Sequence, residues 1–586
     1  MVTRPRILTR EIKAGVDSLP VDMHPVLRRI YLARSVRDLI QTENTLKHLL
    51  PFDQLQGVAQ AVAILVDALQ KQQRILIVGD YDADGATSCA LAVRVLRAFG
   101  ATHVDFLVPN RFEYGYGLTP EIVEVAKGMQ PDVIITVDNG IASIDGVKAA
   151  KAANIQVIIT DHHLPGETLP AADAIVNPNQ AGDPFPSKHL AGVGVIFYLM
   201  LALRAHLREQ HWFETQNRQE PNMAEYLDLV ALGTVADVVK LDHNNRILVA
   251  QGLARMRAGQ ACAGIRALLQ VAGRDEQKVT STDLGFCVGP RLNAAGRLDD
   301  MRVGIACLLC DDPEEAMQRA KVLDKFNRER RQIEQSMREQ AVAQLDKILQ
   351  QTTTDSLPST LCLFDPEFHE GVIGILAGRI KEQTHRPTIV FAQTSNDQIK
   401  GSARSIPGLH IRDALDRVAT LHPALLSKFG GHAMAAGLTI QKAEFEKFTS
   451  VFNTVVDELL DEDALQQVIH SDGRLNAQDI NLQLAQTLRE AGPWGQGFPE
   501  PQFEGEFELV QRRIVGEHHL KMVLKGDNNT LIDAIAFQTT DQDWPEKVDQ
   551  VKLVYKLDVN EFNGKRSVQF IVDYLEPVRQ SLKTSL

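Results

Sequence analysis

Short apolar runs separated by helical stretches organise residues 74–250. The runs Arg74–Val78, Val133–Val137 and Ile155–Thr160 are rich in β-branched residues, and each ends at acidic or turn residues. Runs of this length between helical patterns predict parallel strands that are buried on both faces of an α/β sheet. Weaker runs near Val104–Val108 and Ala174–Val176 predict two further strands.

The pattern changes three times after residue 250. Asp312-Pro313-Glu314-Glu315 supplies an N-cap, a first-turn proline and acidic residues near the helix N-terminus. Because neither Gly nor Pro follows before Gln351, a helix of roughly 55 Å is expected there. A second α/β alternation follows. Five short β segments after residue 502 then predict a small barrel like the five-stranded oligonucleotide-binding (OB) fold.

These patterns predict an α/β protein in which a parallel-sheet lobe is joined by a long helix to a smaller α/β lobe, followed by an OB-like β-barrel. The expected segments are an N-terminal helical region (1–73), the first lobe (74–250), a connecting region (251–357) with its bridging helix (312–351), the second lobe (358–460) and the barrel (466–577).

Acidic residues follow the predicted strands at one edge of the sheet. Five aspartates and two histidines follow three of these strands: Asp80, Asp82, Asp84, Asp138, Asp161, His162 and His163. Ligands of such sheets bind beyond the carboxyl ends of the strands. Carboxylates at this density resist ionisation unless cations neutralise them. The pattern therefore predicts a metal-dependent site, to which a helix ending at Asp237 adds another carboxylate.

Composition and charge indicate an ordinary globular protein and argue against a membrane protein. With 44% hydrophobic and 23% charged residues, the chain has the composition of an ordinary globular protein. Its net charge of −13 argues against binding nucleic acid by overall electrostatics, but a local basic groove remains possible. The N-terminal residues lack a signal-peptide core, and no apolar stretch is long enough for a membrane span. We expect a cytoplasmic protein without membrane contact.

Four motifs occur in a characteristic order along the first lobe. GDYDADGATS (79–88), VDNG (137–140), DHH (161–163) and GTVAD (233–237) resemble the motifs of the DHH phosphoesterase superfamily. Residues 369–371 (HEG), 402–405 (SARS) and 430–432 (GGH) resemble its DHHA1 partner domain. With the OB-like end, the plan is similar to the bacterial exonucleases of this superfamily. The resemblance implies metal-dependent 5′→3′ degradation of single-stranded DNA to 5′-mononucleotides in DNA repair and recombination.

The resemblance also implies a ligand set. Asp80, Asp82 and Asp138 would bind one ion, and Asp84, Asp138, His162 and Asp237 the other, so that Asp138 would bridge them. The superfamily often has His at the position of Asp80, and an oxygen ligand there suits Mn²⁺ or Mg²⁺ better than zinc. His163 would not bind metal but would face the scissile phosphate or the leaving oxygen. The expected catalytic residues are Asp82, Asp84, Asp138, His162 and His163.

Substrate-binding residues are expected in three places. A loop with aromatics and glycines offers Arg111 and Tyr114, and a small-residue segment offers Arg291, Asn293 and Arg297. The second lobe would contribute Ser402, Arg404 and His432. In the barrel, cations alternate with aromatics such as Phe507 and Tyr555, which suits single-strand binding, although alternating strands also bury aromatics in any barrel.

The implied partners are single-stranded DNA, single-strand-binding protein and a RecQ-type helicase. Two alternatives remain open at this point. A DHH-type hydrolase of short oligonucleotides or cyclic dinucleotides would not need the long helix or the barrel. An inactive scaffold that binds single strands would not need all six candidate metal ligands, which are present here.

Overall fold

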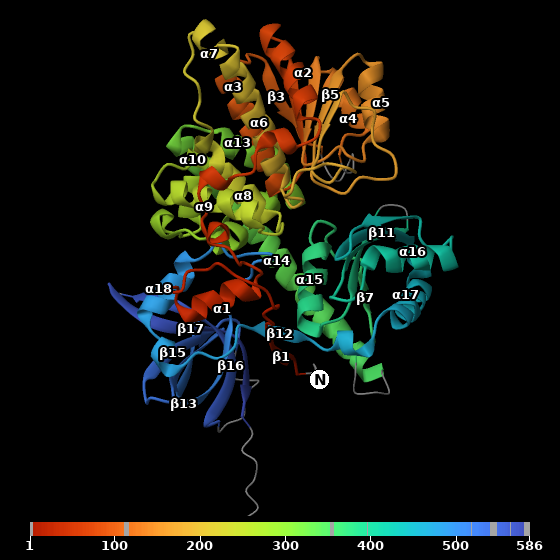
Figure 1. The fold of residues 1–586 in the computed structure, drawn as a ribbon. Helices are drawn as coiled ribbons and strands as arrows, with labels where there is room; N and C mark the ends of the chain where they lie inside the picture. The colour runs from red at the N-terminus through yellow and green to blue at the C-terminus, as the bar shows by residue number, and fades with distance from the viewer. Residues whose placement is uncertain are drawn as a thin grey trace, which may run out of the picture. The chain divides into compact units, whose positions relative to one another are not determined.

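The computed structural model describes residues 4–109, 117–351, 357–394, 397–516, 518–539, 548–562 and 564–578. The chain divides into two compact units, which are described separately. The larger unit comprises residues 9–324 and 470–586, and the smaller unit comprises residues 1–8 and 325–469. Figure 1 shows the elements of each.

A parallel five-stranded sheet forms the centre of the larger unit. Its order is β3 (Val104–Leu107), β2 (Ile75–Gly79), β4 (Val133–Val137), β5 (Gln156–Thr160) and β6 (Ala174–Val176). One face packs against α4 (Pro120–Lys127) and α5 (Ile144–Ala152). The other face packs against α2 (Val58–Gln70), α3 (Ala83–Phe99) and α6 (Gly192–Glu209) (Figure 1). The predicted parallel α/β sheet is confirmed.

A helical region follows the sheet in the same unit. It contains α7 (Trp212–Thr215), α8 (Leu227–Ala236), α9 (His243–Arg257), α10 (Ala263–Val271), α11 (Ser281–Asp283), a π-helical turn (Leu284–Val288), α12 (Gly289–Leu298) and α13 (Arg302–Leu309). Helix α8 packs against α3, α9 and α12. The predicted long helix is α14 (Pro313–Gln351), which continues without interruption for 39 residues. It begins in the larger unit, and its residues from 325 onward belong to the smaller unit.

The C-terminal part of the larger unit is a closed barrel. Its strands follow the order β13 (Phe503–Val515), β14 (His519–Lys525), β15 (Leu531–Ala536), β17 (Lys565–Pro577) and β16 (Gln550–Phe562). The predicted five-stranded barrel is confirmed. Its core also contains residues of α18 (Leu482–Glu490) and of α1 (Pro25–Ala33), such as Val26 and Ile30. Helix α1 is therefore part of the barrel core.

Strand β1 (Arg6–Thr9) pairs with β12 (Val468–Ser471). The prediction of a mostly helical N-terminal region missed this strand, because four residues are too few to establish a periodicity. Among the described residues, no single helix has the length and hydropathy to cross a membrane, although the bent pair 46–54 and 58–70 passes this test together.

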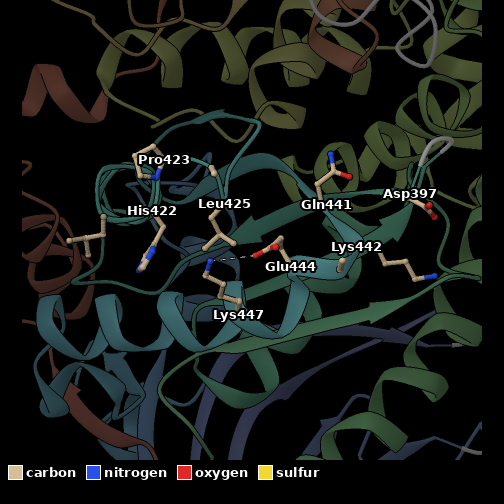
Figure 2. Close-up of a pocket in the computed structure, with 11 residues that line it drawn as sticks. Asp397, His422, Pro423, Leu425, Gln441, Lys442, Glu444 and Lys447 are labelled. Atoms are coloured by element: carbon tan, nitrogen blue, oxygen red, sulfur yellow. Dashed lines mark ion pairs between the residues drawn. The ribbon is translucent and has the colours of Figure 1, made fainter.

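The smaller unit contains a mixed sheet of order β10 (Lys428–Gly431), β11 (Ala435–Gln441), β9 (Gln398–Arg404), β8 (Thr388–Gln393) and β7 (Leu361–Asp365). Its helices are α15 (Ile373–Thr384), α16 (Ile411–Leu421) and α17 (Phe445–Leu459). A cavity of about 1160 Å³ lies at the end of α16 and the start of α17 (Figure 2). Its charges are of both signs, and Lys447 Nζ lies 3.7 Å from Glu444 Oε2.

Candidate metal centre

Strand register places three aspartates at the same level of the sheet edge. Gly79 pairs with Val137, and Val137 pairs with Thr160, at the ends of β2, β4 and β5. The next residues are Asp80, Asp138 and Asp161. The strand order reverses between β2 and β4, and this switch point is where ligands bind in open α/β sheets.

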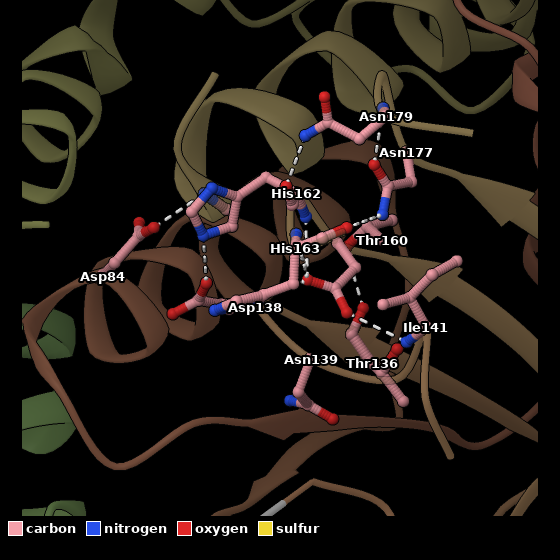
Figure 3. Close-up of polar contacts among 12 residues, drawn as sticks. Asp84, Thr136, Asp138, Asn139, Ile141, Thr160, His162, His163, Asn177 and Asn179 are labelled. Carbon is pink, nitrogen blue, oxygen red and sulfur yellow. Dashed lines mark hydrogen bonds and ion pairs between the residues drawn. The ribbon is translucent and has the colours of Figure 1, made fainter. Parts of the chain in front are cut away.

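The structure brings all six predicted metal ligands together. Three overlapping groups have ligand atoms that all lie within 4.8 Å of one another: Asp80, Asp82 and Asp138; Asp84, His162 and Asp237; and Asp138, His162 and His163. His162 connects the groups, because its Nε2 lies 3.0 Å from Asp138 Oδ1 and 3.5 Å from Asp237 Oδ2. Figure 3 shows the His162 ring between the carboxylates of Asp84 and Asp138.

The start of α3 positions the first motif. Asp82 is the N-cap, and its Oδ1 accepts hydrogen bonds from the backbone N–H groups of Asp84 and Gly85 at 3.0 Å. A Cβ at Gly85 would lie 2.5 Å from the carbonyl oxygen of Asp80, so only glycine allows this close approach. The helix N-terminus also favours the negative charge of Asp82 and Asp84.

The N-terminus of α6 orients Asp84, and this was not predicted. The backbone N–H groups of Gly192 and Val193 donate to the two oxygens of Asp84 at 2.6 and 2.9 Å. A Cβ at Gly192 would lie 2.6 Å from Cβ of Asp138, which makes glycine necessary there. The available signal was the pair of glycines, Gly192 and Gly194, at the start of an apolar helix.

Asp161 organises the DHH segment. Its Oδ1 accepts from the backbone N–H of His162 at 2.7 Å and lies 2.8 Å from Nδ1 of His163. The side chains of Asn177 and Asn179 donate to the carbonyl oxygens of His163 and His162 at 2.9 and 2.6 Å (Figure 3). These two asparagines follow β6 and were also missed, because their role depends on contacts across the sheet edge.

The site is electrostatically unfavourable for its own carboxylates. Burial raises the pKa of Asp84 to about 7, and the nearby charge of Asp82 adds to this, although backbone hydrogen bonds oppose it. Burial and the surrounding aspartates also raise the pKa of Asp138 and of Asp237. For His163, burial lowers the pKa, but the hydrogen bond and charge of Asp161 outweigh it and raise the pKa.

These shifts predict how metal-free stability depends on pH. Because the folded state holds a proton on Asp84 that the unfolded state releases above about pH 4, the free energy of unfolding falls as pH rises from about 4 to 7. We expect the melting temperature in EDTA to decrease over this range. Saturating Mn²⁺ should stabilise the protein more at pH 8 than at pH 5.

Thermal unfolding at several pH values, with EDTA or Mn²⁺, measures this effect. Asp84→Asn removes one titrating carboxyl group, so its melting temperature in EDTA should depend less on pH. A wild-type melting temperature in EDTA that rises steadily from pH 5 to pH 8 would contradict the interpretation.

The donor set fits divalent cations. Five carboxylates and the imidazoles of His162 and His163 converge, and no thiol belongs to the groups found among the described residues. Carboxylate oxygen is the ligand type that Mn²⁺ and Mg²⁺ prefer. Two cations would offset the like-charge repulsion that raises the pKa of Asp84, Asp138 and Asp237.

The expected substrate residues on α12 have different surroundings. Asn293 Oδ1 accepts from the backbone N–H of Ala83 at 2.8 Å and so supports the loop that carries the first motif. Arg291 is buried and donates to Asp324 and to the carbonyl oxygen of Cys287. Arg297 lies on the last turn of α12 and is half-buried.

In the smaller unit, Ser402 and Arg404 lie together on β9. Arg404 Nη1 donates to Ser402 Oγ at 3.1 Å, and burial lowers the pKa of the guanidinium. A Cβ at Gly374, at the start of α15, would lie within 3.0 Å of both side chains. His432 is exposed between β10 and β11. Arg111 and Tyr114 lie outside the described residues.

The barrel corrects one part of the single-strand-binding hypothesis. Phe507 and Tyr555 are buried in the barrel core, where Tyr555 stacks on Phe570 at 3.8 Å. The idea that these two aromatics stack on bases is therefore wrong. Two of the barrel cations, Lys525 and Lys556, are half-buried and form ion pairs of 2.9 and 3.0 Å with Glu508 and Glu500.

Comparison with known proteins shows which family this chain belongs to. Residues 74–234 match the DHH family, N-terminal domain, residues 357–458 the DHHA1 domain, and residues 471–574 the RecJ OB domain. Over 571 residues, the chain is 54% identical to the single-stranded-DNA-specific exonuclease RecJ of Escherichia coli, covering 97% of this chain and 98% of that relative. The chain belongs to the RecJ family.

Other RecJ proteins agree with this assignment. RecJ of Thermus thermophilus is 34% identical over 518 residues, which are 87% of this chain and 69% of that relative. A crystal structure of RecJ from the same organism in complex with Mn²⁺ has a TM-score of 0.78 at 30% identity, covering 98% of this chain and 80% of that chain. A complex with Mg²⁺ has a TM-score of 0.73. The predicted resemblance is confirmed.

Proposed function

We propose that this chain is a metal-dependent exonuclease that degrades single-stranded DNA from the 5′ end to 5′-mononucleotides. The observation that carries the proposal is the pair of ligand groups connected through Asp138 and His162 at the switch point of the sheet. The 54% identity to a single-stranded-DNA-specific exonuclease over nearly the whole chain supports the same function. Solved RecJ structures in complex with Mn²⁺ or Mg²⁺ support these two ions as cofactors.

The proposed ligands follow the two groups. Asp80, Asp82 and Asp138 would hold one ion, and Asp84, His162 and Asp237 would hold the other, with Asp138 shared. Bound divalent cations would activate a water molecule and neutralise charge on the phosphate oxygens. Asp82 and Asp84 are held rigidly by helix N-termini, so their geometry needs little adjustment when substrate arrives.

His163 is proposed to act on the leaving group. Its Nδ1 lies against Asp161, so the ring orientation is set and Nε2 points away from that carboxylate. In the reaction, the P–O3′ bond breaks and a water oxygen bonds to phosphorus. His163 would stabilise charge on the departing 3′-oxygen or donate a proton to it. Asp161 would act as a positioning residue.

Substrate contacts are proposed for three regions. Arg111 and Tyr114, then Arg291, Asn293 and Arg297, and finally Ser402, Arg404 and His432 are the expected contact residues. The buried ion pair of Arg291 with Asp324 favours a supporting role for this side chain. The neighbourhood of Ser402, Arg404 and the start of α15 combines a cation with helix N–H groups, which suits a phosphate.

The wider role is also a proposal. We propose the five segments 1–73, 74–250, 251–357, 358–460 and 466–577 as functional divisions. The resemblance to the exonuclease family supports a role in DNA repair and recombination, with single-strand-binding protein and a RecQ-type helicase as partners. The proposed cytoplasmic location rests on the sequence features of the N-terminus and on the lengths of the apolar stretches.

The test compares strands with blocked ends. A single strand blocked at its 3′ end should be degraded to mononucleotides in Mn²⁺ or Mg²⁺, and a 5′-blocked strand should stay intact. A blunt duplex should react more slowly, because opening each base-pair step costs about 1.4 kcal/mol, or about tenfold in population. Equal hydrolysis of blunt duplex and single strand, or activity that survives EDTA, would overturn the proposal.

A further inference from the structure

The side chain of Asn139 bridges two strands at the metal centre. Asn139 follows Asp138 and is fully buried. Its Nδ2 donates hydrogen bonds to the carbonyl oxygen of Val78 at 3.1 Å and to that of Val137 at 2.9 Å. Val78 belongs to β2 and Val137 to β4. One amide nitrogen therefore connects the two neighbouring strands at the switch point of the sheet.

This bridge involves the strand ends that carry two proposed metal ligands. Gly79, at the end of β2, pairs with Val137, at the end of β4. The residues that follow them are Asp80 and Asp138, which belong to one ligand group. The hydrogen bonds of Asn139 therefore hold together the two strand ends from which these carboxylates extend.

The turn after β4 explains how Asn139 reaches these carbonyl groups. Asp138 has a φ of +62°, so the chain leaves the extended conformation directly after the strand. Gly140 has a φ of +114°, and a Cβ there would lie 2.4 Å from Thr136 Oγ1. On the β5 side, the backbone N–H of Asp138 donates to the carbonyl oxygen of Thr160 at 3.0 Å. The turn is thus held to β5 by its backbone and to β2 by the Asn139 side chain.

The charges of the ligand group make such a bridge useful. Burial raises the pKa of Asp138, and the negative charges of neighbouring aspartates, Asp80 among them, raise it further. Repulsion between the two carboxylates favours a wider spacing of the strand ends when no cation is bound. A side-chain amide can oppose this movement, because it donates two hydrogen bonds without adding a charge.

We propose that Asn139 is a positioning residue, which holds the ends of β2 and β4 so that Asp80 and Asp138 keep the spacing that a divalent cation requires. In this role Asn139 contacts neither the ion nor the substrate. The inference rests on the proposed metal-dependent function and deepens it, because it names a residue that sets the geometry of one ligand group. All of these residues lie in the larger unit.

Calorimetric titration of the metal-free full chain with Mn²⁺ tests the bridge. Asn139→Leu keeps nearly the size of the side chain but removes both hydrogen bonds. Groups that orient metal ligands typically contribute about ten- to hundredfold to metal affinity, so we expect Mn²⁺ binding to weaken at least about tenfold. Asn139→Ser is the second variant. Its smaller side chain leaves room for water beside the two carbonyl groups, so it should fold even if the leucine variant does not, and its Mn²⁺ binding should also weaken.

The control is Tyr198→Phe, which removes a buried hydrogen bond of 2.9 Å to Asn244 in the same unit. It should lower the melting temperature in EDTA and leave the Mn²⁺ affinity unchanged. Hydrolysis of a single strand gives a second readout. At limiting Mn²⁺ the Asn139 variants should be slower than the wild type, and added Mn²⁺ should restore most of the rate, since all six proposed ligands remain. A residue with a merely structural role would change the melting temperature without changing the Mn²⁺ affinity.

The outcomes distinguish this inference from the proposed function. If the wild type neither binds Mn²⁺ nor degrades single strands, the proposed function fails. If the wild type does both, and the folded Asn139 variants bind Mn²⁺ as tightly as the wild type, the positioning role alone is overturned.

Discussion

Asp138→Asn is expected to lower the rate of single-strand hydrolysis at least about a thousandfold, the scale seen when one essential member of a catalytic unit is removed. Asp138 belongs to two of the ligand groups, one of them with His162, so its loss weakens both proposed sites. Asparagine is the sharper choice than alanine, because φ at this position is +62° and Asn tolerates that conformation. Its shape also preserves the packing against Gly192.

The effect of Asp138→Asn on thermal stability should depend on whether Mn²⁺ is present. In EDTA, Asp138→Asn removes a buried carboxylate that is repelled by its neighbours, so its melting temperature should match or exceed that of the wild type. In Mn²⁺, the wild type should gain stability by binding the ion, and the variant should gain much less. Thermal unfolding with and without Mn²⁺ measures both effects.

Asp145→Asn is the control for this substitution. Asp145 is an exposed carboxylate in the first turn of α5, and neutralising it should leave both rate and Mn²⁺ stabilisation close to wild type. If Asp138→Asn retained more than about a tenth of wild-type activity, the assignment of a shared essential carboxylate would be wrong.

Asp472→Ala is expected to destabilise the larger unit by about 3–5 kcal/mol, the usual cost of removing one partner of a buried ion pair. Both oxygens of Asp472 accept from Arg34, at 2.7 and 3.0 Å, and the two side chains are 1% and 2% exposed. Arg34 also donates to the carbonyl oxygen of Pro499 at 2.8 Å. The substitution would leave a buried guanidinium without its counter-charge.

Urea denaturation of the full chain measures this loss. The control is Asp67→Ala, which breaks an exposed ion pair with Lys71 and should cost less than about 1 kcal/mol. A change in Asp472→Ala no larger than that of the control would show that the pair does not hold the barrel segment. The barrel segment also covers Val26 and Ile30 of α1, which belong to the same hydrophobic core.

Local patterns were sufficient for the main architecture and for gathering the carboxylates at one edge of the sheet. The β-branched runs identified the strands β2, β4 and β5, because buried parallel strands leave short apolar segments between helices. The carboxylates could then be placed together, since parallel strands end at one edge of a sheet. The absence of Gly and Pro predicted α14, and strand count predicted the barrel. Family resemblance supplied the assignment of individual ligands and the polarity of the reaction.

The tertiary structure decided the interactions that join distant segments. The N–H groups of Gly192 and Val193 orient Asp84, and Asn177 and Asn179 hold the DHH backbone. Periodicity and motif spacing describe only a few neighbouring residues, so they contain no information on such contacts.

Burial was decided in the same way. Arg291 looked available for phosphate, yet it is enclosed with Asp324, and Tyr555 looked available for bases, yet it stacks on Phe570 inside the barrel. The sequence identifies the chemical type of each side chain. The neighbours that enclose it depend on how elements far apart in the chain pack together, and that packing decides whether the side chain meets substrate or core.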